Sequence, residues 1–149
     1  MKEYKGIRIV RKTHKITNPK ANGSYSKSRN AIILYDRFFD LEPDIQSSIL
    51  EHEYSHYIWH KMPSSIQKIW KLISVGDPRI LKKLDYKENA YVTQYAKTKI
   101  TEDWAECIEV ERLLSNSKKY KGKRFGTYAD FKLKIAKKIY DYYCRQEHW

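Results

Sequence analysis

The residues His52-Glu53-Tyr54-Ser55-His56 form an HExxH pattern, which is the stretch of this chain with the spacing to do chemistry. On an α-helix, side chains four residues apart are neighbours, so His52 and His56 can point at one metal ion. Glu53 lies about 100° around the helix from His52, where it can accept a proton from a metal-activated water. The pattern also occurs by chance, and two histidines on a helix are often hydrogen-bonded polar groups. Alone, it leaves both interpretations open.

The residues around the pattern predict the buried helix that a metal site needs. Pro43 suits the first position of a helix, and Asp44 adds negative charge to the first turn. Pro63 ends the pattern after Met62. Apolar residues fall on most sides of this helix: Ile45, Ile49, Leu50, Tyr57, Ile58 and Trp59. Such a helix lies in a core, where the inward histidines and carboxylate need partners that a metal ion would supply.

A catalytic zinc site has three protein ligands and one open position, so a third ligand is required. His60 is nearest in sequence, but on a continuous helix it lies ~12 Å along the axis from His52. The longer pattern HExxHxxGxxH is absent, because Trp59 and Met62 occupy its Gly and His positions. The third ligand is therefore expected further along the chain.

A second helical pattern begins at Thr101, which is a suitable N-cap, with carboxylates in the first turn. Glu102 and Glu106 share one face of this helix, so one can bind a metal while the other orients a histidine. Trp104 and Ile108 give the helix an apolar side. The alternative for such an acidic run is a solvated face.

The two motifs together resemble those of the gluzincin metallopeptidases of the anthrax lethal factor type. The chain is near the size of their small single-domain members, the minigluzincins. In that family a tyrosine, a small residue, a threonine and then E-x-x-A-E follow the HExxH helix, and residues 95–106 match this order. The resemblance implies that His52, His56 and Glu102 bind one zinc ion.

The same resemblance implies roles for four further parts of the chain. Glu53 matches the general base and acid, and Glu106 matches an acidic residue that orients the ligands. Tyr95, which the family spacing favours over Tyr91, matches the tyrosine that supports the oxyanion. In gluzincins the strand before the HExxH helix pairs with extended substrate, a case of β-augmentation. The residues at that position here are Asn30, Ala31, Ile32, Ile33 and Leu34.

Length and composition predict a single folded domain of residues 1–149, which are 41% hydrophobic and include 13 Tyr and 4 Trp. The fold class expected is α+β: a small twisted N-terminal sheet packs on the HExxH helix, and a mostly helical C-terminal half carries the glutamate helix. The cleft would lie between residues 1–61 and residues 62–149. The expected elements, in chain order, are strands at 6–12 and 28–35, a loop at 18–24, and helices at 43–62, 64–73, 80–84, 101–114 and 127–143.

The last of these helices is expected to pack behind the glutamate helix. Its apolar side would consist of Phe131, Ile135, Ile139 and Tyr142 or Tyr143. The tail that follows contains Cys144, Glu147 and His148, so a cysteine, a carboxylate or a histidine could block the fourth metal position. Because small gluzincins are made as zymogens, this tail is a candidate for holding the enzyme latent.

The N-terminus lacks the apolar segment of a signal peptide, and no apolar run is long enough to span a membrane. The cysteines, Cys107 and Cys144, are then expected to be reduced thiols in the cytoplasm.

The net charge is +12, and it is concentrated near the two ends of the chain. Residues 2–29 and residues 118–138 each contain nine Lys or Arg and one acidic residue. This charge can serve solubility, or it can attract nucleic acid or an acidic protein; no nucleic-acid-binding motif accompanies it. The sequence therefore predicts a zinc-dependent endopeptidase acting on peptide or protein. Its alternatives are a basic nucleic-acid- or partner-binding domain on a metallopeptidase fold, and a DNA-associated protease.

Overall fold

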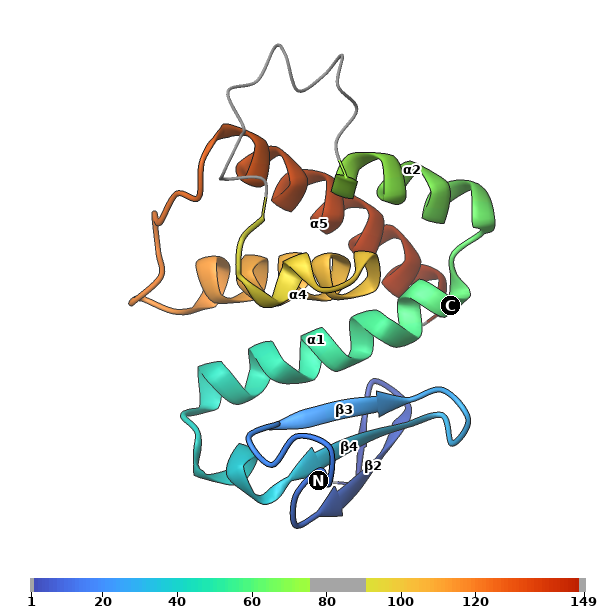
Figure 1. The fold of residues 1–149 in the computed structure, drawn as a ribbon, viewed down its shortest axis with the longest axis vertical. Coiled ribbons are helices and arrows are strands. Elements are labelled where there is room, and N and C mark those ends of the chain that lie inside the picture. Colours follow the sequence, from blue (N-terminus) through green and yellow to red (C-terminus); the bar gives the residue numbers. More distant parts are fainter. Residues whose placement is uncertain (1, 76–90, 148–149) are drawn as a thin grey trace.

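The structure, a computed structural model, describes residues 2–75 and 91–147 and has the α+β architecture that the sequence predicts. A small sheet formed by the N-terminal residues lies on one side of the central helix α1 (Pro43–Lys61). Helices α4 (Ile100–Asn116) and α5 (Thr127–Glu147) lie on its other side, as Figure 1 shows. The central helix is therefore enclosed by both halves of the chain.

The sheet is mixed and has the strand order β1-β2-β4-β3. Its strands are β1 (Glu3–Tyr4), β2 (Ile7–Lys12), β3 (Gly23–Ser26) and β4 (Ala31–Tyr35). β2 runs parallel to β4, while β1 and β3 pair antiparallel with their neighbours. A tight turn with φ of 48° at Lys5 and 81° at Gly6 joins β1 to β2, and glycine adopts the second of these conformations without steric cost. The strand predicted at 6–12 is confirmed.

The second predicted strand is shorter than expected, because residues 28–30 form the turn from β3 into β4. Asn30 takes a φ of 47° there and donates its backbone N–H to the carbonyl of Lys27 over 3.2 Å. β3 falls partly inside the stretch expected as a loop, since Gly23-Ser24-Tyr25-Ser26 lacks the alternating apolar residues that mark a strand.

Residues 30–34 were predicted to pair with an extended substrate through their main chain, and this prediction is wrong. β4 lies inside the sheet, with β2 hydrogen-bonded along one edge and β3 along the other. Its backbone groups are therefore already used, and its side chains are buried. Asn30 itself lies in the turn before β4. The unpaired edge on this side of the described sheet belongs to β3.

Helix α1 begins where the sequence predicts it, with Pro43 in its first turn. Met62 caps its C-terminus, donating its backbone N–H to the carbonyl of Ile58 over 3.0 Å, and Pro63 follows. Tyr54 and Ile58 have no exposed surface. The indole N–H of Trp104, on α4, reaches across to the carbonyl of Ser55 over 2.9 Å. This bond fixes the glutamate helix against the HExxH helix.

The other helices match the expected order with shifted ends. α2 (Ser64–Val75) is slightly longer than predicted, and short 3-10 turns occur at η1 (Asp36–Asp40) and η3 (Tyr95–Lys97). α4 starts at Ile100 with Lys99 as its N-cap residue, so Thr101 lies inside the helix and does not cap it. The helical turn expected at 80–84 lies outside the described residues.

Helix α5 packs against α4 as expected, and Ile135, Ile139 and Tyr143 of the predicted apolar side pack against the core, but the most buried face lies beside that side. Its buried residues are Tyr128, Ala129, Lys132, Leu133, Ala136 and Tyr140. Phe131, Ile135 and Ile139 are only partly buried, and Tyr142 is 51% exposed. The difference comes from Lys132, whose ammonium lies 2.7 Å from the carboxylate of Asp103 on α4, with both side chains fully buried. A lysine in the buried stripe was not foreseen because its partner is distant in sequence.

Breaking the Asp103–Lys132 pair is expected to destabilise the fold more than any exposed pair. Lys132→Met should lower the free energy of unfolding by about 3–5 kcal/mol, because it leaves a buried carboxylate without its counter-charge. Adding Asp103→Leu to that variant should restore most of the loss. Urea unfolding measures both effects.

The matched control is Lys137→Met, which breaks the exposed pair with Asp141 at 3.1 Å and should cost under about 0.5 kcal/mol. Equal losses from the two lysine substitutions would contradict this account of α4–α5 packing.

Candidate metal centre

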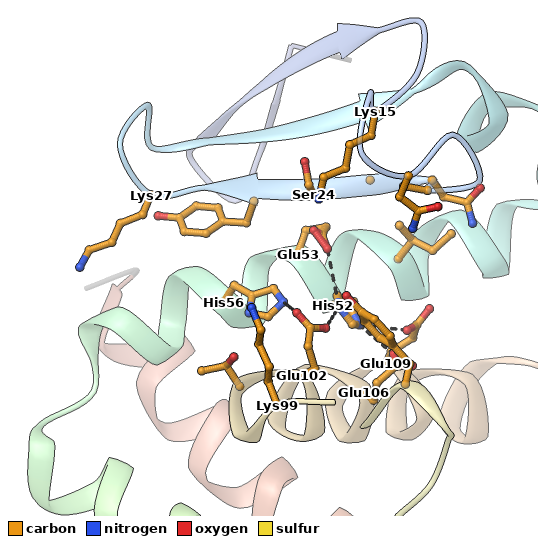
Figure 2. Close-up of a pocket in the computed structure, with 18 of the residues that line it drawn as sticks. Lys15, Ser24, Lys27, His52, Glu53, His56, Lys99, Glu102, Glu106 and Glu109 are labelled. Carbon is orange, nitrogen blue, oxygen red and sulfur yellow. Dashed lines mark hydrogen bonds and ion pairs between the residues drawn. The ribbon is translucent and has the colours of Figure 1, made fainter. Parts of the chain in front are cut away.

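A pocket of about 550 Å³ lies where the sheet, α1 and α4 meet. Its lining includes His52, Glu53 and His56 from α1, together with Tyr95 from η3. The first turns of α4 supply carboxylates, and β3 with the loop before it forms the opposite wall. Figure 2 shows the residues from α1 and α4 pointing toward one another across this pocket. The halves of the chain predicted to flank a cleft both contribute to it.

Glu102 lies between the two histidines of the HExxH pattern. One of its carboxylate oxygens is 3.1 Å from Nε2 of His52, and the other is 3.0 Å from Nε2 of His56. The two imidazole rings, four residues apart on α1, have centroids 5.2 Å apart. The structure thus brings together the three side chains that the sequence suggested as ligands, although they come from separate helices (Figure 2).

Glu53 is buried beside this group, with an oxygen 3.6 Å from Nε2 of His52. Its other oxygen, Oε2, has no hydrogen-bond partner among the described residues. Burial raises the pKa of the Glu53 carboxyl. Gly23 of β3 packs against it, since a Cβ at that position would lie 3.5 Å from Cγ of Glu53 and 3.3 Å from the carbonyl oxygen of Ile33. A buried carboxylate oxygen without a partner indicates a missing cation or water.

The other nitrogen of His52, Nδ1, faces two more carboxylates on α4. It lies 3.0 Å from Glu106 and 3.1 Å from Glu109. Thr93 donates its hydroxyl to the second oxygen of Glu106 over 2.9 Å. Carboxylates in this position fix the ring orientation of a metal-binding histidine. Glu106 therefore lies where the sequence suggested, and Glu109 is an addition.

Glu109 was not singled out from the sequence, although a signal for it exists. Glu102, Glu106 and Glu109 are spaced i, i+4 and i+7, which places all three on one helical face. An acidic stripe of this kind is usually solvated. Only the position of α1 across from it shows that the stripe faces inward.

The carboxylates around His52 strongly perturb one another's protonation. Burial alone would lower the pKa of His52, but the hydrogen bonds that its ring donates to Glu102, Glu106 and Glu109 outweigh burial and raise that pKa well above its usual value. Burial has the opposite effect on a carboxyl group and alone would raise the pKa of Glu102. The two histidines nevertheless hold the pKa of Glu102 far below its usual value. Burial would raise the pKa of Glu106, but its contacts with His52, Glu109 and Thr93 together outweigh burial and lower the pKa to about 2. Burial raises the pKa of Glu109 to about 7.

The described residues include two groups of side chains that could hold a metal ion. Ligand atoms within 4.8 Å of one another occur in His52, Glu53 and His56, and again in His52, Glu106 and Glu109. Glu102 adjoins the first group: its oxygens lie 3.1 Å from Nε2 of His52 and 3.0 Å from Nε2 of His56, whereas Glu53 is 3.6 Å from Nε2 of His52. Two imidazoles and one carboxylate are a donor set that fits a divalent transition metal such as zinc.

Tyr95 lies beside the candidate metal-binding group, which consists of His52, His56 and Glu102. Its ring stacks on that of His52, with centroids 6.5 Å apart and an interplanar angle of 28°, and the side chain remains 53% exposed. Burial and then the nearby Glu102 carboxylate raise the pKa of its hydroxyl. Tyr91, the alternative, lies under the ammonium of Lys132, 4.2 Å from its ring centroid, and is not part of the pocket lining. Of the two tyrosines, only Tyr95 is positioned to meet a pocket ligand.

Two other sequence candidates lie away from the metal-binding group. His60 sits at the pocket margin, where its ring contacts Tyr25 at 6.2 Å between centroids. Cys144, proposed as a latency ligand, is in α5, and it packs on the core beside Tyr140. The structure therefore gives no support to metal blocking by Cys144, while His148 lies outside the described residues.

Comparison of the chain with protein-family models, with curated proteins and with solved structures found no match. Among the described residues, no helix is long and apolar enough to cross a membrane, as expected from the sequence.

Removing the carboxylates behind His52 is expected to weaken metal binding without removing a ligand. Glu109→Gln and Glu106→Gln should each lower the affinity for Zn²⁺ by about 10–100-fold, because the imidazole loses the partner that orients it. Competition with a chromophoric chelator measures the affinity. Glu111→Gln, also on α4 but bonded to Ser115 outside the pocket, is the control and should bind Zn²⁺ normally. Unchanged affinity in both test variants would show that these carboxylates have another purpose.

Proposed function

We propose that this protein is a zinc-dependent endopeptidase of the gluzincin type. The observation that carries the proposal is the position of Glu102, whose two oxygens reach Nε2 of both His52 and His56 at 3.0–3.1 Å. Glu53 lies directly beside this group, in a pocket large enough for a peptide segment. The order and spacing of the motifs in the chain, HExxH followed by E-x-x-A-E, support the same assignment.

With three protein ligands, a four-coordinate metal ion would keep one position open for water or substrate. His52, His56 and Glu102 would hold the ion, which when bound polarises the scissile carbonyl and makes water a better nucleophile. Glu106 and Glu109 keep the His52 ring in place from behind. A structural site with four closed ligands would not need the carboxylate of Glu53 with its unpartnered oxygen.

Glu53 handles the protons of the reaction in this proposal. It accepts a proton from the attacking water as the water oxygen bonds to the carbonyl carbon. It then returns that proton to the amide nitrogen as the C–N bond breaks, which leaves a carboxylic acid and an amine. The tight packing of Gly23 against its side chain holds the carboxylate on the pocket side of α1.

Tyr95 stabilises the negative charge that develops on the carbonyl oxygen. Its ring stacks on His52, and its side chain is exposed enough to reach a bound substrate. A hydroxyl that donates a hydrogen bond to the forming oxyanion lowers the barrier without tightening substrate binding.

The free edge of β3 provides a surface for the substrate main chain. β3 pairs with β4 along one edge only. Three of its four residues, Gly23, Ser24 and Tyr25, line the pocket. An extended peptide added to this edge would form main-chain hydrogen bonds and lie between the sheet and α1. This assignment replaces residues 30–34, whose backbone is already paired.

Hydrolysis of an unfolded protein substrate tests the proposal. The full-length protein should cleave it when loaded with Zn²⁺, lose activity in a chelator, and regain activity when Zn²⁺ is restored. A zinc-loaded protein that cleaves no peptide bond would refute the peptidase assignment.

Glu53→Gln should separate metal binding from catalysis. The amide keeps the shape of the side chain but cannot accept a proton, so hydrolysis should fall by at least about 10²-fold, while the protein still binds one Zn²⁺ per chain. Metal analysis and peptide hydrolysis on the same preparation measure the two effects. Full activity with full zinc content would remove Glu53 from the mechanism.

Tyr95→Phe and Tyr91→Phe form a matched pair that identifies the tyrosine involved. Tyr95→Phe should lower kcat by about 10²-fold with little change in KM, because only the oxyanion loses a donor. Tyr91→Phe should leave kcat unchanged, since that ring lies beside Lys132. Steady-state kinetics with one peptide distinguishes them, and the reverse pattern would favour Tyr91.

A further inference from the structure

The pocket separates its charges by depth. Its described lining contains the carboxylates Glu53, Glu102, Glu106 and Glu109, all from α1 or α4 and all at least partly buried. It also contains four lysines, which are exposed and lie around the mouth. They are Lys15, Lys20, Lys27 and Lys99. No exposed carboxylate accompanies these lysines in the described lining, so the mouth is positive while the floor is acidic.

These four ammonium groups have no ion-pair partner among the residues that the structure describes. Several lysines elsewhere are neutralised, as in the pairs of Lys5 with Glu51 at 2.9 Å and Lys132 with Asp103 at 2.7 Å. Of the floor carboxylates, Glu102 and Glu106 are bonded to His52. Glu53 is buried and interacts with the charge of Lys15 without forming an ion pair with it. A cluster of unpaired cations around a cleft creates a positive potential that favours an anionic ligand.

We propose that the cleft selects peptides with acidic side chains on both sides of the scissile bond, an inference that rests on the proposed peptidase function. The lysines are arranged along the strand that would hold the substrate. Lys27 directly follows β3, and Lys15 and Lys20 precede it on the same wall. Lys99 stands at the start of α4, so that Figure 2 shows Lys27 on the sheet side and Lys99 on the helix side of the pocket.

The dimensions suit acidic residues close to the cleaved bond. β3 has four residues and, at about 3.3 Å per residue, covers ~13 Å of an extended peptide. Side chains two or three positions from the scissile bond then reach the ends of β3, where Lys20 and Lys27 lie. Lys99 lies on the helix side of the same pocket (Figure 2).

A peptide fits this charge pattern better than a nucleic acid does. An acidic peptide places its neutral main chain over the carboxylates of the floor and its carboxylate side chains against the lysines. A nucleic acid carries a charge on every backbone unit, so a strand laid in the cleft would bring phosphates onto Glu53 and Glu102. The acidic floor therefore favours an acidic peptide over a polyanionic backbone.

The test uses three pools of quenched fluorescent peptides with the same randomised centre. The flanking positions are Glu in one pool, Gln in the second and Lys in the third. At low salt the zinc-loaded protein should cleave the Glu pool with a kcat/KM about tenfold above that of the Gln pool, with the Lys pool slowest. This preference should shrink as salt screens the exposed charges.

Charge reversal at the mouth should reverse the preference. The double variant Lys27→Glu with Lys99→Glu should favour the Lys pool, while Lys71→Glu with Lys138→Glu, which alters exposed lysines outside the pocket, should behave as the unmodified protein does. Chelator-sensitive cleavage of all three pools at equal rates would overturn the inference and leave the peptidase intact.

Binding to the Glu53→Gln variant tests the inference independently of hydrolysis. Fluorescence anisotropy should give tighter binding for an uncleaved Glu-flanked peptide than for its Gln-flanked counterpart. Equal affinities, or tighter binding of a single-stranded DNA of equal charge, would overturn the assignment to acidic peptides. If none of the pools is cleaved but the Glu peptide still binds selectively, the peptidase proposal fails and the acidic-peptide surface stands.

Discussion

The contact of one Glu102 carboxylate with both imidazoles of the HExxH pattern is the interaction on which the site depends. This contact joins α4 to α1. The two residues that follow Glu102 in the chain hold α4 in position. Asp103 is paired with the buried Lys132 of α5, and Trp104 donates to the carbonyl of Ser55 on α1. Three consecutive residues of α4 therefore contact four residues on two helices, α1 and α5. A small rotation of this helix would break all of these contacts together.

The same helix also explains how the charges of the site are arranged. Spacing of i, i+4 and i+7 directs Glu102, Glu106 and Glu109 toward α1, where His52 contacts all of them. Three carboxylates facing a buried region would repel one another without cations. Zn²⁺ between the histidines would offset two of these negative charges, and an N–H on Nδ1 of His52 would donate a hydrogen bond to the carboxylates behind the ring. Of the four lysines in the pocket lining, Lys15 acts electrostatically on Glu53, and none forms an ion pair with a described carboxylate.

The sequence predicted the parts of the fold that follow from local patterns. The HExxH helix has proline at its start and just beyond its end, and the strand at 6–12 alternates apolar and basic residues, so both were found. β3 was missed because Gly23-Ser24-Tyr25-Ser26 has no apolar alternation. The buried face of α5 was misjudged, since Lys132 is buried only because Asp103 lies opposite. The contact of Glu109 with His52 and the position of residues 31–35 inside the sheet were not predicted either. Both depend on contacts between segments that are distant in sequence, and local periodicity does not show such contacts.

The central claim is that a single ion is held by His52, His56 and Glu102. Anomalous diffraction at the zinc absorption edge, from crystals of the zinc-loaded protein, tests it most directly. We expect one strong peak per chain, with Nε2 of both histidines at ~2.0–2.1 Å and a Glu102 oxygen at ~2.0–2.2 Å. A peak at any other position, or a zinc ion bound without Glu102, would contradict the account.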